Sequence, residues 1–225
     1  MSPVEKGRLL IKYPTRSRPA QFKQTLEHYI SLLADPDNTR FLFSFDTDDT
    51  SMDAEWLKPY LATLGVGYTD RWGKSRNKVD AINRDLEGYD YPWDILLLAS
   101  DDMLPRVYGY DKLIREQFQA NGPDRFLWIN DGRQDRICTI ACMDRAYYER
   151  DGFIYNPKYL SLYCDNEQQE VAKNRGRLIT APNWITNESY QWGGTIANDA
   201  LYRRNNRHYL TDQRTFKARQ RAGFP

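Results

Sequence analysis

Short apolar runs alternate with amphipathic stretches along the first 130 residues. The runs at 8–13, 39–45, 66–68, 95–99 and 126–129 predict β-strands, because each is short and is bounded by polar residues or proline. Apolar residues at helical spacing predict helices over 20–33, 53–64, 75–86 and 108–121. We expect Asp53 and Ser75 to cap the second and third of these helices. Such alternation predicts an α/β fold with a mostly parallel central sheet flanked by helices.

The second half of the chain is less regular. Its pattern predicts strands at 139–143 and 178–180 and helices at 144–150, 165–175 and 211–222. No internal repeat or low-complexity linker divides the 225 residues, so we expect a single domain.

Composition narrows the class of protein. With 40% hydrophobic and 28% charged residues, the chain can bury a substantial core, and its net charge of +1 creates no overall attraction to nucleic acid or anionic membranes. No apolar run approaches the ~20 residues that a membrane-spanning helix needs. The first residues lack the apolar core of a signal peptide, and the three cysteines form no Cys-x-x-Cys pair. We therefore expect a cytoplasmic location.

The most informative segment is 93–105, where an apolar run ends in Asp101 and Asp102. Adjacent carboxylates repel each other unless a positive charge lies near them. Divalent Mg²⁺ or Mn²⁺ prefers oxygen ligands and often shares the phosphates of a substrate. The segment therefore indicates metal-assisted chemistry on a phosphate-bearing substrate, although a solvated turn after a strand would also explain two aspartates.

Polar residues also follow two other predicted strands. Arg16 and Arg18 come after the first and could hold a phosphate bidentately. Asp46 and Asp48 come after the second and could bind a nucleotide base or ribose. Because parallel strands end at the same edge of a sheet, we expect these groups to surround one crevice.

Three further segments each allow a functional and a structural interpretation. The basic segment that begins at Lys74 could bind an anion at a helix N-terminus or simply cap the helix. Asp165 could be a helix N-cap or a general base. The basic C-terminal region around His208 could contact a diphosphate or a polyanionic acceptor, or form a solvated helix face.

Taken in order, these signals resemble the GT-A glycosyltransferases, most closely family 2 members of phage and bacterial type. The resemblance covers most of the chain. It rests on Pro14-Thr15-Arg16, the acids Asp46, Asp48 and Asp49, Gly73-Lys74-Ser75 with Ala81-Ile82-Asn83, Asp101-Asp102 before Leu104-Pro105, Asp151-Gly152-Phe153, Cys164-Asp165-Asn166-Glu167, and the ending Arg219-Gln220-Arg221-Ala222-Gly223-Phe224.

The resemblance implies one GT-A, Rossmann-like domain over 1–225, with a nucleotide-sugar-binding half at 1–105 and an acceptor-binding half with a basic C-terminal helix at 106–225. It implies metal-assisted, inverting transfer of a hexosyl-type group from a nucleotide-sugar, with a UDP-sugar expected. Asp165 would be the catalytic base. The residues expected at the donor are Pro14, Thr15, Arg16, Asp46, Asp48, Lys74, Asn83 and Ser100, and those expected at Mn²⁺ or Mg²⁺ are Asp101, Asp102 and His208.

The chain departs from the family pattern at the metal site. Ala99 replaces the first acid of the usual Asp-Ala-Asp-Asp, and the His-x-His pair of many relatives is missing. Glu188 or His208 could complete the metal site, or the site could be lost. These departures keep a non-catalytic nucleotide-sugar-binding protein as an alternative.

The acceptor is left open by the sequence. The phage-like ending allows a hydroxymethylated pyrimidine in phage DNA, in which case the protein would work in the host cytoplasm; a glycan or a protein is also possible. Trp128, Trp184 and Trp192 could stack on a sugar or base. The alternative from another class is a HAD-type phosphohydrolase, since 46–50 resembles the Asp-x-Asp-x-Thr nucleophile loop of those enzymes.

Overall fold

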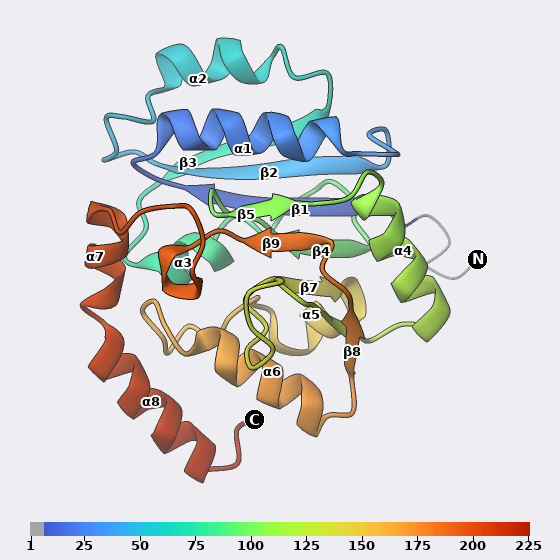
Figure 1. The fold of residues 1–225 in the computed structure, drawn as a ribbon, viewed down its shortest axis with the longest axis vertical. Helices are drawn as coiled ribbons and strands as arrows, with labels where there is room; N and C mark the ends of the chain where they lie inside the picture. Colours follow the sequence, from blue (N-terminus) through green and yellow to red (C-terminus); the bar gives the residue numbers. More distant parts are fainter. Residues whose placement is uncertain (1–6) are drawn as a thin grey trace.

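The computed structural model describes residues 7–225. A seven-stranded sheet with the order β3-β2-β1-β4-β7-β6-β8 forms its centre (Figure 1). Four neighbouring strands, β3, β2, β1 and β4, are parallel, whereas β7 is antiparallel to both β4 and β6. The strands span Leu9–Thr15 (β1), Thr39–Asp46 (β2), Gly67–Gly73 (β3), Ile95–Leu98 (β4), Phe126–Ile129 (β6), Ala141–Asp144 (β7) and Leu178–Ala181 (β8). The prediction of an α/β fold with a mostly parallel sheet is confirmed.

Alternating residues of the strands build one apolar core on each face of the sheet. On β1, Leu9 and Ile11 belong to one core and Leu10 belongs to the other. Helices α1 (Pro19–Ser31), α2 (Ala54–Leu61) and α4 (Tyr110–Asn121) contribute to the first core. Helices α3 (Lys78–Asn83), α5 (Arg145–Asp151) and α6 (Cys164–Asn174) contribute to the second. The central strands are therefore buried on both faces, as their continuous apolar runs predict.

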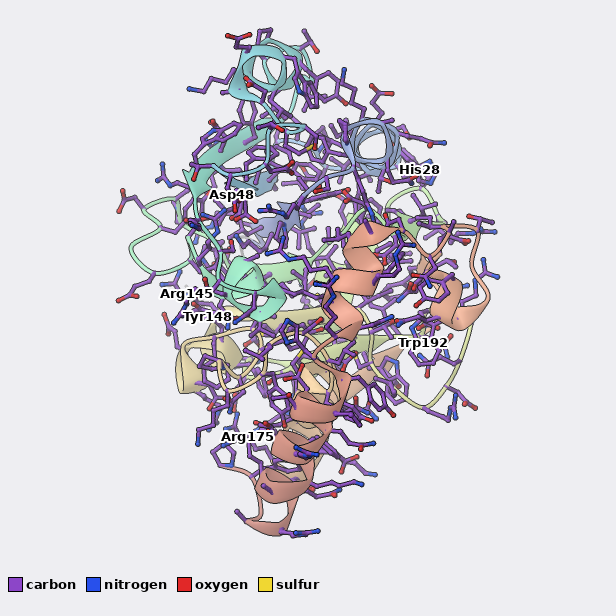
Figure 2. The ribbon with its side chains drawn as sticks, turned by 90° about the vertical axis from the view of Figure 1, so that its left-hand side faces the viewer. His28, Asp48, Arg145, Tyr148, Arg175 and Trp192 are labelled. Carbon is purple, nitrogen blue, oxygen red and sulfur yellow. The ribbon has the colours of Figure 1, made fainter. Side chains whose placement is uncertain are left out.

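Two short strands and one helix beside the sheet are absent from the sequence predictions, whereas the helix expected at 211–222 is present. The short strands β5 (Met103–Pro105) and β9 (Ile185–Asn187) pair in an antiparallel two-stranded sheet. The segment after β9 leads through a single 3-10 turn, η2 (Tyr190–Trp192), to helix α7 (Ala200–Asn206) and then to α8 (Tyr209–Arg221). These last two helices form an arm along one side of the molecule, which faces the viewer in Figure 2.

Two predicted helices, at 53–64 and 75–86, are shorter than expected, and the second shows the reason most clearly. The pattern predicts a helix over 75–86 capped by Ser75, but α3 begins after Asn77, whose side chain accepts a hydrogen bond from the Asp80 amide at 2.9 Å. The amide of Ser75 instead donates to Asp46. The predicted cap at Asp53 is confirmed, because its carboxylate accepts a hydrogen bond from the Glu55 amide.

Within residues 7–225, every helix is too short or too polar to cross a lipid bilayer.

Candidate active site

The carboxyl ends of β1, β2 and β4 open into a cavity of about 540 Å³. The prediction that these three strand ends surround one crevice is confirmed. The segment 75–82, which includes the start of α3, adds to the lining, and the second half of the chain adds mainly the segments 161–166, 187–192 and 201–209. Nine of the twelve residues expected at the site line this cavity: Pro14, Thr15, Arg16, Asp46, Ser100, Asp101, Asp102, Asp165 and His208.

Asp101 lines the cavity and is buried, with 4% of its surface exposed. It lies three residues after the end of β4, and the neighbouring strand β1 supplies its hydrogen-bond donors: Tyr13 Oη at 3.0 Å and Thr15 Oγ1 at 3.1 Å. Burial is the main cause that raises the pKa of Asp101, to about 7, and the charge of Arg18 opposes this rise. Two neutral hydroxyls therefore orient the carboxylate without supplying a neutralising charge.

Asp102 is held by hydroxyl groups as well. Ser100 Oγ donates to Oδ1, and Tyr202 Oη donates to Oδ2 at 2.6 Å. Tyr202 belongs to α7, which begins at the N-cap Asp199. This contact fixes the start of the C-terminal arm over the strand ends, and the sequence predictions did not include it.

The donor set at the end of β4 suits a hard divalent cation. Asp101 and Asp102 offer carboxylate oxygens, and the raised pKa of Asp101 means that a cation would stabilise its charged form. Among residues 7–225 no group of three His, Cys, Asp or Glu side chains could hold a metal ion. Two carboxylates still fit Mg²⁺ or Mn²⁺, because such ions commonly take their remaining ligands from substrate phosphates and water.

The two candidates for a third ligand lie in different places. His208 lines the cavity, at the N-cap position of α8. Glu188 does not line it. Its carboxylate accepts hydrogen bonds from Arg133 Nη2 at 2.6 and 2.7 Å and is 4% exposed. Glu188 lies outside the cavity and its carboxylate is paired with Arg133, so the structure does not support Glu188 as a third metal ligand.

Asp46 lines the cavity at the end of β2, with both oxygens engaged. Oδ1 accepts from the Ser75 amide at 3.0 Å, and Oδ2 accepts from Arg16 Nη1 at 2.8 Å. Arg16 also pairs with Asp48, and this pairing is the leading cause that lowers the pKa of Asp48. The Arg16 guanidinium is thus used to organise two aspartates, although it was expected to contact the nucleotide directly.

Three of the expected donor-binding residues do not line the cavity. Asp48 is exposed and bound to Arg16, and it lies near the β2–β3 end of the sheet (Figure 2). Lys74 is exposed beside it, whereas the nearby Lys78 does line the cavity. The side-chain amide of Asn83 joins α3 to the loop at 154–155, donating to the Tyr155 carbonyl and accepting from the amides of both loop residues. Its role in the structure is to hold that loop.

The arrangement of 46–50 does not match the phosphohydrolase alternative. A nucleophilic Asp-x-Asp loop needs both acids at the reacting centre. Here Asp46 is bound to Arg16 and to the Ser75 amide, and Asp48 lies outside the cavity.

Asp165 lies in the first turn of α6 and lines the cavity. The expectation that Asp165 is the N-cap is wrong, because Tyr163 occupies that position with a left-handed backbone (φ 61°). Burial raises the pKa of Asp165, and the nearby Lys78 opposes the rise. A half-buried carboxylate with a raised pKa that faces a cavity is a candidate general base.

The C-terminal helix α8 holds the segment that carries Asp165. The Asp212 carboxylate, 0% exposed, accepts hydrogen bonds from the backbone amides of Leu160, Ser161 and Leu162 at 2.8–2.9 Å. Arg219 forms two hydrogen bonds to the buried Glu167 on α6. Arg219, one of the cations of the basic C-terminal region, therefore binds α8 to α6. The others are exposed: Arg203, Arg204, Arg207, Arg214, Lys217 and Arg221.

The three tryptophans proposed as stacking residues are separated. Trp192 lines the cavity. Trp184 is 8% exposed and belongs to the first apolar core. Trp128 lines a separate hollow at the β6–β8 edge. Only Trp192 is therefore placed to meet a ligand in the main cavity.

Comparison with known proteins identifies the architecture. No protein-family model and no curated protein sequence matches the chain. Among solved structures, a mannosyltransferase from Pyrobaculum calidifontis in complex with GDP-Man and Mn²⁺ superposes with a TM-score of 0.63 at 16% identity over 78% of this chain. TarS from S. aureus gives a TM-score of 0.66 at 10% identity over 94% of this chain. The chain has the GT-A fold.

A third similar structure has a length closer to that of this chain. Glucosyl-3-phosphoglycerate synthase from Mycobacterium tuberculosis, in complex with Mn²⁺, UDP and phosphoglyceric acid, gives a TM-score of 0.60 at 12% identity over 99% of this chain and 81% of its own. The chain spans 55% of the mannosyltransferase and 39% of TarS. At these identities the likeness establishes the fold.

The sequence predictions missed Tyr202 and the structural role of Asp212. A local signal for the first exists: Asp199 followed by Ala200 and Leu201 is a typical helix start. Nothing near Asp212 in the sequence indicates that it binds amides about 50 residues away.

Proposed function

We propose that this protein transfers a sugar from a nucleotide-sugar donor to an acceptor hydroxyl, with inversion at the anomeric carbon. The observation that carries the proposal is one cavity in which Asp46, the Asp101–Asp102 pair and Asp165 come together from both halves of a GT-A fold. Its volume of about 540 Å³ is within the range of small-molecule and cofactor sites. The solved neighbours that bind GDP-Man or UDP support a nucleotide-sugar as the donor class.

The strand ends would bind the donor. Asp46, oriented by Arg16 and the Ser75 amide, would accept hydrogen bonds from the base through its remaining lone pairs, and we propose uracil as that base. Asp101 and Asp102 would hold Mn²⁺ or Mg²⁺, which when bound neutralises charge on the leaving diphosphate. The hydroxyls of Tyr13 and Thr15 keep the Asp101 carboxylate in one orientation at this position.

Asp165 would act on the acceptor. Its carboxylate takes the proton from the acceptor hydroxyl as that oxygen forms a bond to the anomeric carbon, and the bond from this carbon to the diphosphate breaks with its electron pair leaving on the diphosphate. A base with a raised pKa suits this task, because general-base help is greatest when its pKa lies near the working pH.

For the acceptor, we propose hydroxymethylated pyrimidine in DNA. Residues 200–221 contain seven Lys or Arg and one acid, and the net charge of the whole chain is only +1. Most of these cations are exposed on an arm whose first residues, including Arg204 and His208, line the cavity. Such a surface suits the phosphates of a polyanion next to the reacting hydroxyl. A glycan is the alternative acceptor, and transfer to it should depend much less on salt.

A cytoplasmic location fits this function. The three cysteines are buried and unpaired, as in proteins of reducing compartments.

The deciding experiment is a thermal-shift panel of UDP, GDP, CDP and their sugars with Mn²⁺, Mg²⁺ or EDTA, followed by a transfer assay. A ligand that binds the native state raises the melting temperature, so a metal-dependent shift names the donor class. Asp165→Asn should abolish transfer and leave donor binding intact. Binding without transfer in the wild type would support the non-catalytic alternative, and no shift with any nucleotide would overturn the proposal.

A further inference from the structure

Arg18 is a buried cation at the edge of the cavity. Its side chain is 9% exposed and lines the cavity at the start of α1. Nε donates to Asp199 Oδ2 at 2.7 Å, and the guanidinium carbon lies 4.4 Å from the centre of the Tyr202 ring. These contacts fix the plane of the guanidinium, since an ion pair holds one edge and an aromatic ring covers one face.

One nitrogen of the Arg18 guanidinium, Nη2, is buried and has no hydrogen-bond acceptor within the part of the chain that the structure describes. A buried donor without an acceptor is costly, and native proteins seldom leave one unless a ligand or water completes it. Arg16, the other arginine at these strand ends, is by contrast already bound to two carboxylates.

Arg18 lies close to where the diphosphate, the proposed leaving group, would bind. Its charge interacts with both Asp101 and Asp102, which places the guanidinium in the same part of the cavity as the proposed cation site. A guanidinium presents donors in a planar fork that matches phosphate oxygens, and it keeps its charge at any pH at which the protein is folded.

We propose that Arg18 binds the diphosphate of the nucleotide donor through Nη2, the nitrogen that has no hydrogen-bond partner among the described residues. The inference rests on the proposed function. It adds to that function a positive charge, on the protein itself, that would bind the diphosphate. Nη2 is covered by its neighbours, and Asp199, the N-cap of α7, is paired with the guanidinium. Binding of a phosphate at Nη2 therefore requires α7 to shift away from the strand ends. Asp199 competes with the diphosphate for this charge.

The test is calorimetric binding of the best-binding nucleoside diphosphate from the panel and of the matching nucleoside, which has no phosphates. Arg18→Gln should weaken diphosphate binding about 10–100-fold, the size of a lost charge-assisted hydrogen bond, and should leave nucleoside binding unchanged. Arg18→Lys should lose less, because it retains the charge. The loss of diphosphate affinity in Arg18→Gln should appear both with Mn²⁺ and with EDTA, because the guanidinium charge belongs to the protein.

Asp199→Asn is the matched control. It removes the charge that pairs with Arg18, and asparagine still caps α7. We expect diphosphate affinity to stay the same or to increase.

Three outcomes overturn the inference: Arg18→Gln binds the diphosphate as wild type does, it loses nucleoside and diphosphate affinity equally, or Asp199→Asn loses as much as Arg18→Gln. If the wild type binds no nucleotide, the proposed function itself fails.

Discussion

Replacing Asp212 tests whether the C-terminal helix holds the segment that carries the proposed base. The fully buried carboxylate of Asp212 accepts three backbone amides from 160–162, directly before Tyr163 and Asp165. Asp212→Ala leaves all three amides without this acceptor. Each such loss costs about 1–3 kcal/mol, and we take the lower end because only the Ser161 amide is in a fully buried pair, which gives ~3 kcal/mol in total.

This loss can be measured as a change in melting temperature. For a chain of this size, 1 kcal/mol corresponds to about 2–4 °C, so Asp212→Ala should lower the melting temperature by ~6–12 °C. Asp212→Asn should lose less, because its amide oxygen still accepts. In a transfer assay below the transition, kcat should fall more than nucleotide affinity, since the residues at the donor lie on other elements.

The matched control is Asp37→Ala, which removes an exposed carboxylate and should change the melting temperature little. A drop below about 2 °C for Asp212→Ala would refute the stability argument. If nucleotide affinity falls as much as kcat, α8 supports the whole site and does not act specifically on the segment of Asp165.

Three further predictions follow from single residues. Because Lys78 opposes the raised pKa of Asp165, Lys78→Met should move the acidic limb of the kcat/KM profile to higher pH; an unmoved limb would mean that another group titrates there. Burial lowers the pKa of Lys12 to about 7, so between pH 7.5 and 9.5 this group binds about one more proton in the unfolded chain than in the folded chain, and its contribution to the unfolding free energy should rise by ~2–3 kcal/mol. In urea titrations the unfolding free energy of wild type minus that of Lys12→Met should rise by this amount over the range, because other titrating groups are common to both proteins, and a difference that does not change with pH would contradict the reasoning. A Cβ on Gly194 would lie 2.1 Å from the backbone of Glu188, so Gly194→Ala should lower stability by ~1–3 kcal/mol in the same titrations, and a neutral effect would argue against this close approach.

The sequence predicted the parts of the fold that depend on local pattern. Strand β4 was expected at 95–99 and is found at Ile95–Leu98. A strand buried on both faces is a continuous apolar run, so it can be predicted from its own residues without knowledge of the neighbouring strands. The helix expected at 75–86 shows the limit of such patterns. It ends at Asn83 because Arg84 is extended and Asp85 has a left-handed backbone (φ 71°), and apolar spacing alone does not indicate either conformation.

The candidate site was predictable only where it lies at the ends of parallel strands. Thr15, Asp46 and Asp101 come together because β2, β1 and β4 are neighbours that run in the same direction. Partners from distant segments were not predictable. The Arg133–Glu188 ion pair spans 55 residues, and it removes from the site a carboxylate that the sequence left as a candidate ligand.

The charges of the C-terminal arm serve two different purposes, and this explains why composition was a poor guide to its role. Asp212 and Arg219 face inward and bind the loop before α6 and α6 itself, so they hold the arm against the domain. The remaining cations stay exposed beside the cavity that Tyr202 helps to close. A net charge near zero therefore conceals a basic surface, because acids elsewhere in the chain balance it. The same helices that position the proposed base would thus present the acceptor to it.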